Sequence, residues 1–580
     1  MQTPLETVTL HNRNTAWCGV LASELVAADV ALAVLCCGAR SSAMALALHA
    51  QPEIETVVFN DERAGAFFAL GWSKSTGRPA VVCTTSGSAV ANLLPALVEA
   101  KATGVPLIAL TCDRPRTIRD AGATQCADHL GLCQAVVEGS VDLGDPVITR
   151  RALLSLRKEV RELLGKLDSQ TTRGPLQINI PLHGELTSMD VDDDWNPPKY
   201  LPSLVRAPAR LPPSPKRKVA SASRPFNKLR LRSGLKGLIA VGPDCPIDVR
   251  RVSVFAEKTG FPVIADAPSG LRRPAALQNV ICNGDLLSMN WSVAELRPDL
   301  LIRLGNAPVS HTMHRYLRAQ RCPVIRIDRR PLGRDFLASD SLSLSFPSDG
   351  TLNVLADTLA PGDSAWAEQW KSLDDRVNAL KNDYLSSLPW GDCKAAWMVC
   401  NTRGFDLFHL GNSMAARHAN LYCDATATAQ KIMVNRGVSG IDGNTATFLG
   451  ELRGNGGSGL LLIGDLAAAH DLTGLEAGKL TGLRGVICII NNRGGAIFDL
   501  LSVADMPDYE RLIRNPVALD FRSIAAAFQI PFTRCETEKQ LSAAMGKARL
   551  QRHLSIIEIR VPETSLKRDL PQLYWLTMTA

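Results

Sequence analysis

Two stretches, Leu460-Leu-Leu-Ile-Gly-Asp465 and Val486-Ile-Cys-Ile-Ile-Asn-Asn492, decide the fold that we expect for this chain. Each starts as an apolar run of strand length and ends in turn-forming residues, and the segment between them, Leu472–Leu480, has helical character. The order strand, helix, strand predicts a βαβ unit whose two parallel strands end at the same edge of one sheet. Ligands of α/β proteins bind at that edge, so we expect a ligand beside Asp465 and Asn492.

The chemistry of Asp465 and Asn492 suits one hard cation. Mg²⁺ takes about six oxygen ligands, few of them from protein and the rest from water and phosphate. The two side chains, a backbone carbonyl near Gly494 and a diphosphate would complete such a shell, so the pair predicts a diphosphate cofactor held through a metal ion. The alternative is that Gly464-Asp465 and Asn491-Asn492 are only turn formers. That alternative explains either dipeptide alone better, whereas the two together favour the metal.

The composition indicates a soluble protein of several domains. The chain has 580 residues, of which 46% are hydrophobic and 21% charged, which is ordinary for globular proteins. No apolar run approaches the roughly 18 residues that span a bilayer, and residues 1–13 lack the pattern of a secretion signal. The fifteen cysteines form no CxxC pair and mostly lie in apolar surroundings. We therefore expect reduced thiols, no zinc, no membrane span and a cytoplasmic location.

The net charge of +7 comes from one segment. Residues 201–236 carry ten Lys or Arg and no acid, and without them the chain has a net charge of −3. The segment is also rich in Pro and Ser, so we interpret residues 198–236 as a solvated linker between domains. A nucleic-acid or membrane-surface role is the less favoured alternative, and we expect no nucleic-acid partner.

The rest of the chain divides into three α/β blocks. We expect domains at 1–197, 237–361 and 400–580, with a connector at 362–399, and the fold class is α/β with three doubly wound parallel-sheet domains. Blocks one and three have similar size and alternation. The buried-strand candidates outside the opening unit are Ala31–Cys36, Thr56–Phe59, Ala80–Thr84, Leu107–Leu110, Gly237–Gly242, Pro262–Ala265, Leu300–Arg303 and Pro323–Ile327.

Glu62 lies in Phe59-Asn-Asp-Glu62, where a predicted strand gives way to a helix. One interpretation is structural, with Asn60 as the helix cap and Glu62 as a first-turn acid favoured by the helix dipole. The other is that the Glu62 carboxylate contacts a ligand at the sheet edge. The local sequence leaves both open.

The Gly-Asp and Asn-Asn pair is similar to the magnesium and diphosphate motif of thiamine diphosphate enzymes in general. Further motifs lie along nearly the whole chain: Asp61-Glu-Arg-Ala-Gly-Ala-Phe-Phe-Ala-Leu-Gly71, Cys83-Thr-Thr-Ser-Gly-Ser-Ala89, Thr111-Cys-Asp-Arg-Pro115, Asn435-Arg-Gly437, Gly440-Ile-Asp-Gly443, and Asn12-Arg-Asn14 with Trp17. Together they resemble one family, the 2-succinyl-5-enolpyruvyl-6-hydroxy-3-cyclohexene-1-carboxylate synthases of menaquinone biosynthesis, which use thiamine diphosphate.

The resemblance implies that 2-oxoglutarate is decarboxylated on the cofactor and that the resulting carbanion adds to isochorismate. It implies that Glu62 hydrogen-bonds the aminopyrimidine ring and promotes formation of the ylid. It implies Mg²⁺ or Mn²⁺ held by Asp465, Asn492 and Gly494. It also implies a homodimer or a dimer of dimers, in which the first domain of one subunit faces the third domain of its partner in a shared active site.

Further site residues follow from the resemblance. Four arginines would bind substrate carboxylates, for which Arg is the best bidentate partner, although each alone is better explained as a surface or structural residue. These arginines are Arg40, Arg114, Arg417 and Arg436. Gln125 would assist proton handling or substrate positioning, Ser413 would contact cofactor or substrate, and Ile441 would hold the cofactor bent. Ile497 and Phe498 would border the site, with a core role equally open.

Three positions depart from the family pattern: Ala39 stands where Ser is usual, Pro308-Val-Ser-His311 occupies a place where Lys is common, and Arg493 replaces a frequent third Asn. Two other functions stay open at this point. One is a different thiamine diphosphate carboligase or decarboxylase of the acetolactate synthase type, which would not require these arginines. The other is a catalytically silent scaffold or regulatory binding protein, which would have no chemical need for Glu62, Asp465 and Asn492 together.

Overall fold

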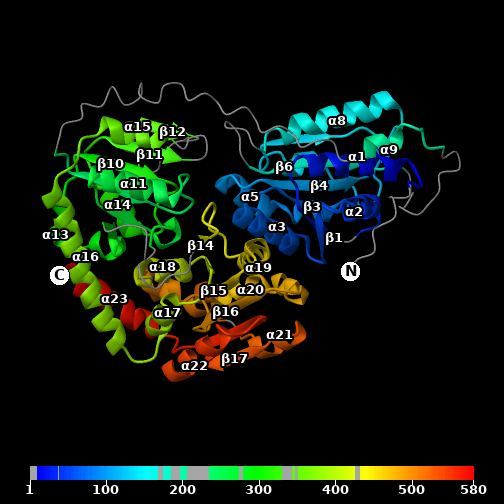
Figure 1. Cartoon of the computed structure of the whole chain (residues 1–580). Coiled ribbons are helices and arrows are strands. Elements are labelled where there is room, and N and C mark those ends of the chain that lie inside the picture. The colour runs from blue at the N-terminus through cyan, green and yellow to red at the C-terminus, as the bar shows by residue number, and fades with distance from the viewer. Residues whose placement is uncertain are drawn as a thin grey trace. The chain divides into compact units, whose positions relative to one another are not determined.

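The structure is a computed structural model of the chain. It describes residues 10–36, 38–119, 121–167, 174–183, 196–205, 234–272, 279–328, 337, 342–345, 350–424, 431–516 and 518–579. Most of the basic segment, residues 206–233, therefore lies outside the described residues. The chain forms two compact units (Figure 1). Unit 1 combines Met1–Lys216 with Ala446–Asn455 and Thr473–Ala477, and unit 2 combines Arg217–Thr445, Gly456–Leu472 and Gly478–Ala580.

Unit 1 is built on a six-stranded parallel sheet of order β2-β1-β3-β4-β6-β5. One helical layer is formed by α1, α2 and α8, and α3 and α5 form another (Figure 1). The strands are β1 (Leu32–Cys36), β2 (Glu55–Phe59), β3 (Ala80–Thr84), β4 (Leu107–Asp113), β5 (Gly139–Asp142) and β6 (Leu176–Pro181). The helices are α1 (Arg13–Ala27), α2 (Ser42–His49), α3 (Glu62–Thr76), α5 (Leu94–Thr103) and α8 (Arg150–Leu164).

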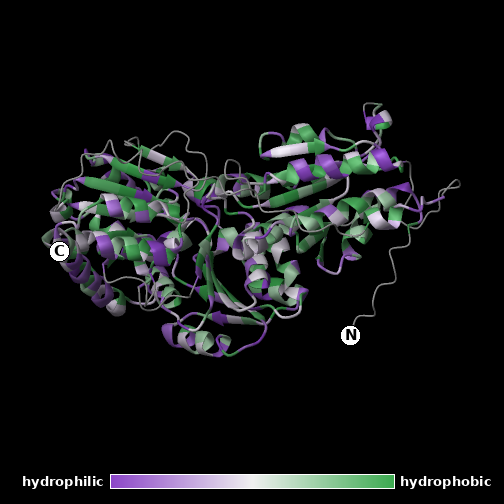
Figure 2. Ribbon diagram, turned by 45° about the horizontal axis from the view of Figure 1, so that its top comes forward, coloured by the Kyte–Doolittle hydropathy of each residue, from purple (hydrophilic) through white to green (hydrophobic). Residues whose placement is uncertain are grey.

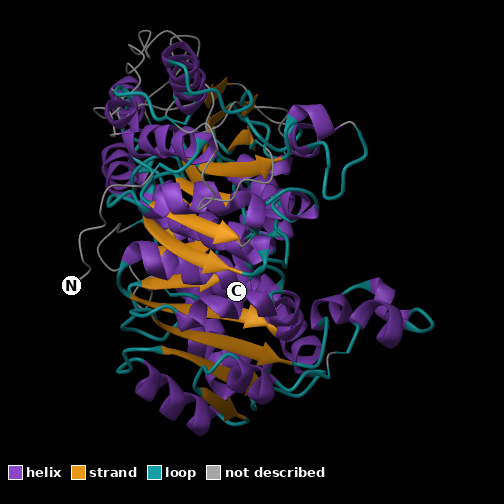
Figure 3. Ribbon diagram, turned by 90° about the vertical axis from the view of Figure 1, so that its right-hand side faces the viewer, coloured by secondary structure: helices purple, strands orange, loops and turns teal. Residues whose placement is uncertain are grey.

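Unit 2 contains two further six-stranded parallel sheets, of order β12-β11-β10-β7-β8-β9 and β14-β13-β15-β16-β18-β17. Helices lie on both sides of the strands (Figure 3). The strands of the first are β7 (Gly237–Val241), β8 (Val263–Ala265), β9 (Val280–Ile281), β10 (Leu300–Leu304), β11 (Val324–Asp328) and β12 (Leu342–Ser345). Those of the second are β13 (Leu407–Leu410), β14 (Lys431–Val434), β15 (Ser458–Gly464), β16 (Arg484–Asn491), β17 (Phe532–Cys535) and β18 (Leu554–Arg560).

The strand orders of the first and third sheets are the same. Counted from the first strand of each sheet, both read 2-1-3-4-6-5, whereas the middle sheet reads 6-5-4-1-2-3. The central strands are buried and strongly hydrophobic (Figure 2), as expected for parallel sheets covered on both faces. The predicted fold class, α/β with three doubly wound parallel sheets, is confirmed.

The predicted unit around Asp465 and Asn492 is also parallel, because β15 pairs with β16 in the register Gly464↔Ile490. Its middle differs from the prediction. An α-helix, α20 (Asp465–His470), follows β15 at once, and Leu472–Lys479 is a 3-10 helix rather than an α-helix. Gly474 and Gly478 in this short segment disfavour a regular α-helix, since glycine costs about 1 kcal/mol relative to alanine in one.

The connector at 362–399 is largely helical. It forms α16 (Ser364–Ser387) and the start of α17 (Asp392–Cys400). Trp366 and Trp370 on α16 are buried, and the Trp366 ring nitrogen donates to the Gly237 carbonyl (2.9 Å) at the start of β7. This contact anchors α16 on the middle sheet.

The fourteen described cysteines are free thiols, and burial raises the pKa of several, including Cys133 to about 11. None of the helices in the described ranges is long and apolar enough to cross a bilayer.

Within unit 1, the backbone of α3 is in close contact with that of residues in α19 (Asn444–Asn455). A Cβ added to Gly71 would lie 2.0 Å from the Thr447 carbonyl oxygen, and one added to Gly450 would lie 2.0 Å from that of Phe68. Only glycine therefore allows this approach of two helix backbones. Glu62 is the first residue of α3, so the contact also bears on the position of that carboxylate.

We predict that Gly71→Ala lowers the stability of unit 1 by about 1–3 kcal/mol, because the new methyl group must push the two helices apart. The thermal unfolding midpoint should fall by about 2–4 °C for each kcal/mol. The matched control is Gly546→Ala in α22 (Glu538–Ala548), where an added Cβ meets nothing within 4 Å and alanine should be neutral or stabilising. Equal midpoints for the two variants would contradict the close crossing.

Candidate active site

Three neighbouring strands of the third sheet end in polar residues. Asn412 and Ser413 follow β13, Asp465 follows β15, and Asn492 follows β16, and these strands are adjacent in the order β13-β15-β16. From β13 the chain continues to β14 toward one edge of the sheet, and from β15 it continues to β16 toward the other edge. The ends of β13 and β15 therefore form the topological switch point, where α/β proteins bind ligands.

Asp465 is buried, with 2% of its surface exposed, at the N-terminus of α20. One carboxylate oxygen accepts the backbone N–H of Leu466 (2.7 Å) and the other accepts that of Gly494 (2.9 Å). Burial raises the pKa of Asp465 to about 6, the two backbone donors oppose the rise, and Asp392 adds to it. The bond to Gly494 draws the loop after β16 against the end of β15.

The Asn492 side chain has a defined orientation. Its Nδ2 donates to Oδ2 of Asp392 (2.8 Å), a residue at the start of α17 that is 1% exposed. His418 lies beside the other Asp392 oxygen, with Nε2 2.7 Å from Oδ1. Asn492 Oδ1 is buried and has no hydrogen-bond partner among the described residues. An acceptor left in this state fits a cation at the same place.

No group of three or more His, Cys, Asp or Glu side chains that could hold a metal occurs among the described residues. The donor set at the end of β15 and β16 is of another kind, with one carboxylate (Asp465), one amide oxygen (Asn492) and backbone oxygens. Hard cations such as Mg²⁺ accept this set when phosphate and water supply the remaining oxygens. The residues present therefore fit the metal expected from the sequence.

A cavity of about 530 Å³ opens beside Asp465. Ile441, Leu466 and Phe498 are among its lining residues. Of the apolar residues expected to border the site, Ile441 is 36% exposed, and Ile497 and Phe498 are half-buried. Ile441, Ile497 and Phe498 are therefore not fully buried core residues. Leu466, which follows Asp465, also lines this cavity, although the sequence carries no signal for that role.

Asn412 connects the segments that carry two of the expected arginines. It is buried, and its Nδ2 donates to the carbonyls of Asn435 (2.7 Å) and Gly440 (2.6 Å). Its Oδ1 accepts from Nη1 of Arg436 (3.4 Å). Ser413 has a left-handed backbone with φ of 69°, which starts α18 (Met414–Tyr422). Asn412 thus holds Arg436 and the turn before Ile441 to the end of β13.

Arg417 is half-buried on α18 and donates to the Ser413 carbonyl (2.8 Å). Burial lowers its pKa, and nearby Asp285 and Tyr574 oppose this. A purely structural role was the alternative for each arginine taken alone. For Arg417 that alternative finds more support than it does for Arg114.

In unit 1 the ends of β1, β3 and β4 are likewise adjacent. A Cβ added to Gly38, just after β1, would lie 2.3 Å from Cβ of Thr85 after β3, so these two loops touch. Arg40, two residues beyond Gly38, is half-buried. Arg114 follows β4, and its guanidinium donates to the Thr124 carbonyl (2.6 Å) and to Oε1 of Gln125 (3.0 Å). The structure thus brings Arg114 and Gln125 together, as the sequence alone did not show.

Glu62 is the first residue of α3, and its half-buried carboxylate accepts a bond from Asn92 Nδ2 (3.3 Å). The interpretation of Asn60 as the helix cap is wrong. Asp61 caps the helix by accepting the N–H groups of Arg63 and Ala64. Asn60 is instead held by Glu476, to which its backbone N–H (3.0 Å) and Nδ2 (2.6 Å) both donate. Both Asn and Asp are good caps, so this tertiary contact decides between them.

The three departures from the family pattern occupy different surroundings. Ala39 is exposed just after β1. His311 is exposed at the start of α14 (His311–Ala319), with its ring 5.4 Å from that of His314. Burial, and then His311, Arg303 and Arg436, lower the pKa of His314, while the Pro308 carbonyl opposes this. Arg493 is exposed and pairs with Glu563 (3.2 Å), which directs its side chain to the surface.

Sequence reasoning missed Asp392, the residue that orients Asn492. It follows Trp390-Gly391 in the connector, one hundred positions before Asn492 and away from any strand end. Its only local signal is an acid in the first turn of a helix, which is common and unspecific.

Three parallel sheets with acid and amide side chains at the ends of neighbouring strands are the arrangement expected of a thiamine diphosphate enzyme, and the comparison with protein families shows that class. The model of the family described as "Thiamine pyrophosphate enzyme, N-terminal TPP binding domain" matches residues 19–132. This range includes the strand ends of unit 1 that carry Arg40, Glu62 and Arg114.

Full-length relatives define the family more narrowly. The 2-succinyl-5-enolpyruvyl-6-hydroxy-3-cyclohexene-1-carboxylate synthase of Halobacterium salinarum is 30% identical over 582 residues, which cover 98% of both chains. The proteins of the same name from Synechococcus elongatus (30% identity, 92% of this chain and 91% of the relative) and Geobacillus thermodenitrificans (32%, 93% and 92%) are similar along their lengths. The chain belongs to the family of 2-succinyl-5-enolpyruvyl-6-hydroxy-3-cyclohexene-1-carboxylate synthases.

Proposed function

We propose that the chain catalyses the thiamine diphosphate-dependent decarboxylation of 2-oxoglutarate and the addition of the succinyl unit to isochorismate. The products are 2-succinyl-5-enolpyruvyl-6-hydroxy-3-cyclohexene-1-carboxylate and CO2, in menaquinone biosynthesis. The observation that carries this proposal is the relationship over 98% of both chains to a synthase of that name. Positions at or just after strand ends support the roles of Asp465, Asn492 and Ser413.

Asp465, Asn492 and a carbonyl at Gly494 would hold Mg²⁺ or Mn²⁺, and through it the cofactor diphosphate. The buried, unpartnered Oδ1 of Asn492 and the bond from Gly494 to Asp465 support this assignment. Ser413, at the neighbouring strand end, and Ile441, which lines the adjacent cavity, would contact the rest of the cofactor.

Bound thiamine diphosphate would supply the electron sink that decarboxylation of a 2-oxo acid needs. Glu62 would hold a proton shared with the cofactor's aminopyrimidine ring. Glu62 is half-buried at the start of α3, and among the described residues its carboxylate accepts a bond from Asn92, so a carboxylate oxygen is available for that contact. Gln125 would place or exchange a proton on the substrate side, in contact with Arg114.

The substrates are multiply charged acids, so the chain's arginines would bind and orient their carboxylates. The bonds that Arg114 donates to Thr124 and Gln125, and the bond that Arg436 donates to Asn412, support this role. Arg40 and Arg417 would complete the set, and Ile497 and Phe498 would border the apolar part of the pocket.

We further propose a homodimer, or a dimer of dimers, with active sites shared between subunits, and a cytoplasmic location. The family relationship supports the assembly, and the free, mostly buried thiols are compatible with a reducing compartment.

The direct test is an assay with 2-oxoglutarate and isochorismate, with and without thiamine diphosphate and Mg²⁺. We expect CO2 release and a product that appears only when all four are present. Pyruvate in place of 2-oxoglutarate tests an acetolactate synthase-like activity and should give little turnover. Preferred turnover of pyruvate, or no turnover with either acid, would overturn the proposal.

For Glu62 we predict that Glu62→Gln slows exchange of the cofactor C2 proton by at least about 100-fold, because an amide cannot share the required proton. The cofactor should still bind. Exchange is followed by NMR of the bound cofactor in D2O, with Glu53→Gln, an exposed carboxylate before β2, as control. Normal exchange in Glu62→Gln would refute the assignment.

For Asp392 we predict that Asp392→Ala weakens Mn²⁺ binding by about 10- to 100-fold, the usual effect of losing a residue that orients a metal ligand. Asp392→Asn retains an oxygen for Asn492 Nδ2 and should lose less, whereas Asp465→Ala should lose most. Free Mn²⁺ is measured by electron paramagnetic resonance in the presence of thiamine diphosphate.

The matched control is Asp374→Ala. Asp374 is also buried in unit 2 and accepts an asparagine Nδ2, that of Asn283 (3.0 Å). Its loss should lower stability and leave Mn²⁺ binding unchanged. If Asp392→Ala and Asp374→Ala behave alike, Asp392 does not orient a metal ligand.

A further inference from the structure

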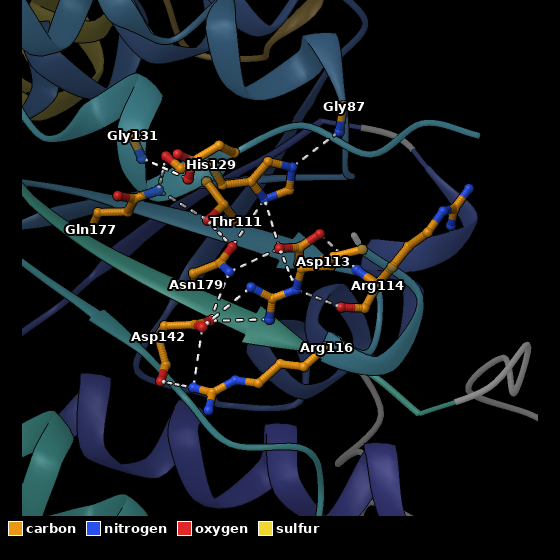
Figure 4. A network of polar contacts seen from close by, with 12 residues as sticks. Gly87, Thr111, Asp113, Arg114, Arg116, His129, Gly131, Asp142, Gln177 and Asn179 are labelled. Atoms are coloured by element: carbon orange, nitrogen blue, oxygen red, sulfur yellow. Dashed lines mark hydrogen bonds and ion pairs between the residues drawn. The ribbon is translucent and has the colours of Figure 1, made fainter. Parts of the chain in front are cut away.

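A buried polar network lies behind the strand ends of unit 1 (Figure 4). We call it the His129 network and define it as His129, Asp113, Asn179, Arg119 and Asp142. His129 starts the short helix α7 (His129–Cys133), Asp113 ends β4 and Asn179 lies on β6. His129, Asp113 and Asn179 are at most 1% exposed. The functions assigned above use none of the five.

The hydrogen bonds of the network can run in one direction only. The backbone N–H of Gly87 donates to Nε2 of His129 (3.1 Å), so this nitrogen carries no proton. The imidazole proton is therefore on Nδ1, which faces Oδ1 of Asn179 (3.0 Å) and Oδ2 of Asp113 (3.4 Å). A neutral ring in this tautomer satisfies every contact, whereas a doubly protonated ring would oppose the Gly87 N–H.

The Asn179 amide is oriented in the same way. Its Nδ2 donates to Asp113 Oδ2 (2.9 Å) and to Asp142 Oδ1 (2.9 Å). Its Oδ1 accepts from Thr111 Oγ1 (2.8 Å) and faces the His129 Nδ1 proton. Two carboxylates thus fix the amide, and the amide fixes the tautomer of His129.

The network also holds the backbone of Arg114 through both its N–H group and its carbonyl group. Asp113 Oδ1 accepts the Arg114 N–H (2.7 Å), and Nε of Arg119 donates to the Arg114 carbonyl (3.0 Å). Arg119 is itself paired with Asp113 (3.2 Å) and, through two nitrogens, with Asp142 (both 3.2 Å). Arg114 therefore leaves the strand at a position determined by buried groups.

Gly87 ties a second segment to the same place. Its φ of 85° is a conformation that glycine adopts readily. A Cβ at this position would lie 3.3 Å from the Gln125 carbonyl oxygen, so the loop after β3 packs directly on the backbone of Gln125. Gln125 in turn accepts a bond from Arg114. His129 thus holds the loop that supports Gln125, and Asp113 holds Arg114.

The Arg114 guanidinium keeps donors for a ligand. Its bonds to Thr124 and Gln125 use Nε and Nη2, and no described residue bonds Nη1. A carboxylate is the natural partner of such a group. The position of a bound carboxylate would then depend on the buried network, which holds the Arg114 backbone, as well as on the bonds of the guanidinium to Thr124 and Gln125.

We propose that His129 is a positioning residue for the substrate-binding segments of unit 1. As a neutral acceptor it holds the Gly87 amide, and through Gly87 and the Asp113–Asn179 pair it places Gln125 and Arg114 for a substrate carboxylate. This proposal rests on the proposed function only in that it takes Arg114 and Gln125 to meet the acid substrate.

The test compares three variants of the full-length protein with the parent. His129→Phe keeps the ring and removes the acceptor, while His129→Gln can return an oxygen acceptor to the Gly87 amide. Glu24→Gln is the control for stability, because Glu24 is buried in unit 1 and paired with Arg161 and Arg157, on α1 rather than at a strand end.

The first measurement is amide hydrogen exchange by mass spectrometry, which needs no activity. In His129→Phe, exchange should rise in peptides that cover 85–88 and 113–125, and His129→Gln should largely restore the parent pattern. Glu24→Gln should change neither segment. Unchanged exchange in His129→Phe, or an equal rise in Glu24→Gln, would overturn the proposal even if the enzyme is active.

The second measurement is steady-state kinetics with 2-oxoglutarate and isochorismate. His129→Phe should lower kcat/KM by about 10- to 100-fold, mainly by raising KM for at least one acid, since small misplacement of binding groups has effects of this size. Thiamine diphosphate affinity should stay within a few-fold of the parent. A loss confined to kcat, or shared with Glu24→Gln, would contradict a positioning role. An inactive parent would instead count against the proposed function, and hydrogen exchange would still decide the role of His129.

Discussion

Burial of the Asp465 carboxylate is the constraint on which the rest of the site depends. A carboxylate removed from water must be compensated by hydrogen bonds or by a cation, or it takes up a proton. Two backbone N–H groups, from Leu466 and Gly494, supply part of this compensation, yet the pKa still rises to about 6. The protein therefore places an incompletely compensated anion at the edge of a parallel sheet.

The neighbouring groups explain what would complete the compensation. Asp392 lies close enough to raise the pKa of Asp465 further, so it adds negative charge to the site and does not compensate the Asp465 carboxylate. Its hydrogen bond to Asn492 turns the amide so that Oδ1, and not the NH2 group, remains without a partner. Two acids and one amide oxygen gathered in this way are costly unless a cation is bound, which is why the geometry favours a metal-anchored diphosphate.

The same device occurs in both units. In unit 2 a carboxylate, Asp392, directs the NH2 group of Asn492 and leaves the amide oxygen for a ligand. In unit 1 two carboxylates, one of them Asp113, direct the NH2 group of Asn179 and leave the amide oxygen for His129. In each case a buried acid decides the orientation of an amide, and the amide decides what the next group can bind.

The sequence predicted those features that depend on local pattern. Strand-length apolar runs ending in turn residues located ten of the eighteen described strands to within a few residues, and parallel pairing then placed Asp465 and Asn492 at one edge. No candidate was named for the other eight, which are β5, β6, β9, β12, β13, β14, β17 and β18. Features set by tertiary contacts were not predictable. Asp392 bonds Asn492, which lies one hundred positions later in the sequence. Asp61 rather than Asn60 caps α3, because Glu476 binds Asn60. His129 lies in no motif that the sequence shows.

The most direct test of this account is the location of a bound metal. Crystals grown with thiamine diphosphate and Mn²⁺, with diffraction recorded at the manganese absorption edge, would show the ion as an anomalous peak. We expect one peak within roughly 2–2.3 Å of an Asp465 carboxylate oxygen and of Asn492 Oδ1, with Asn492 Nδ2 still on Asp392. A peak away from these two oxygens, or an Asn492 amide turned with its NH2 group toward the metal, would contradict the account.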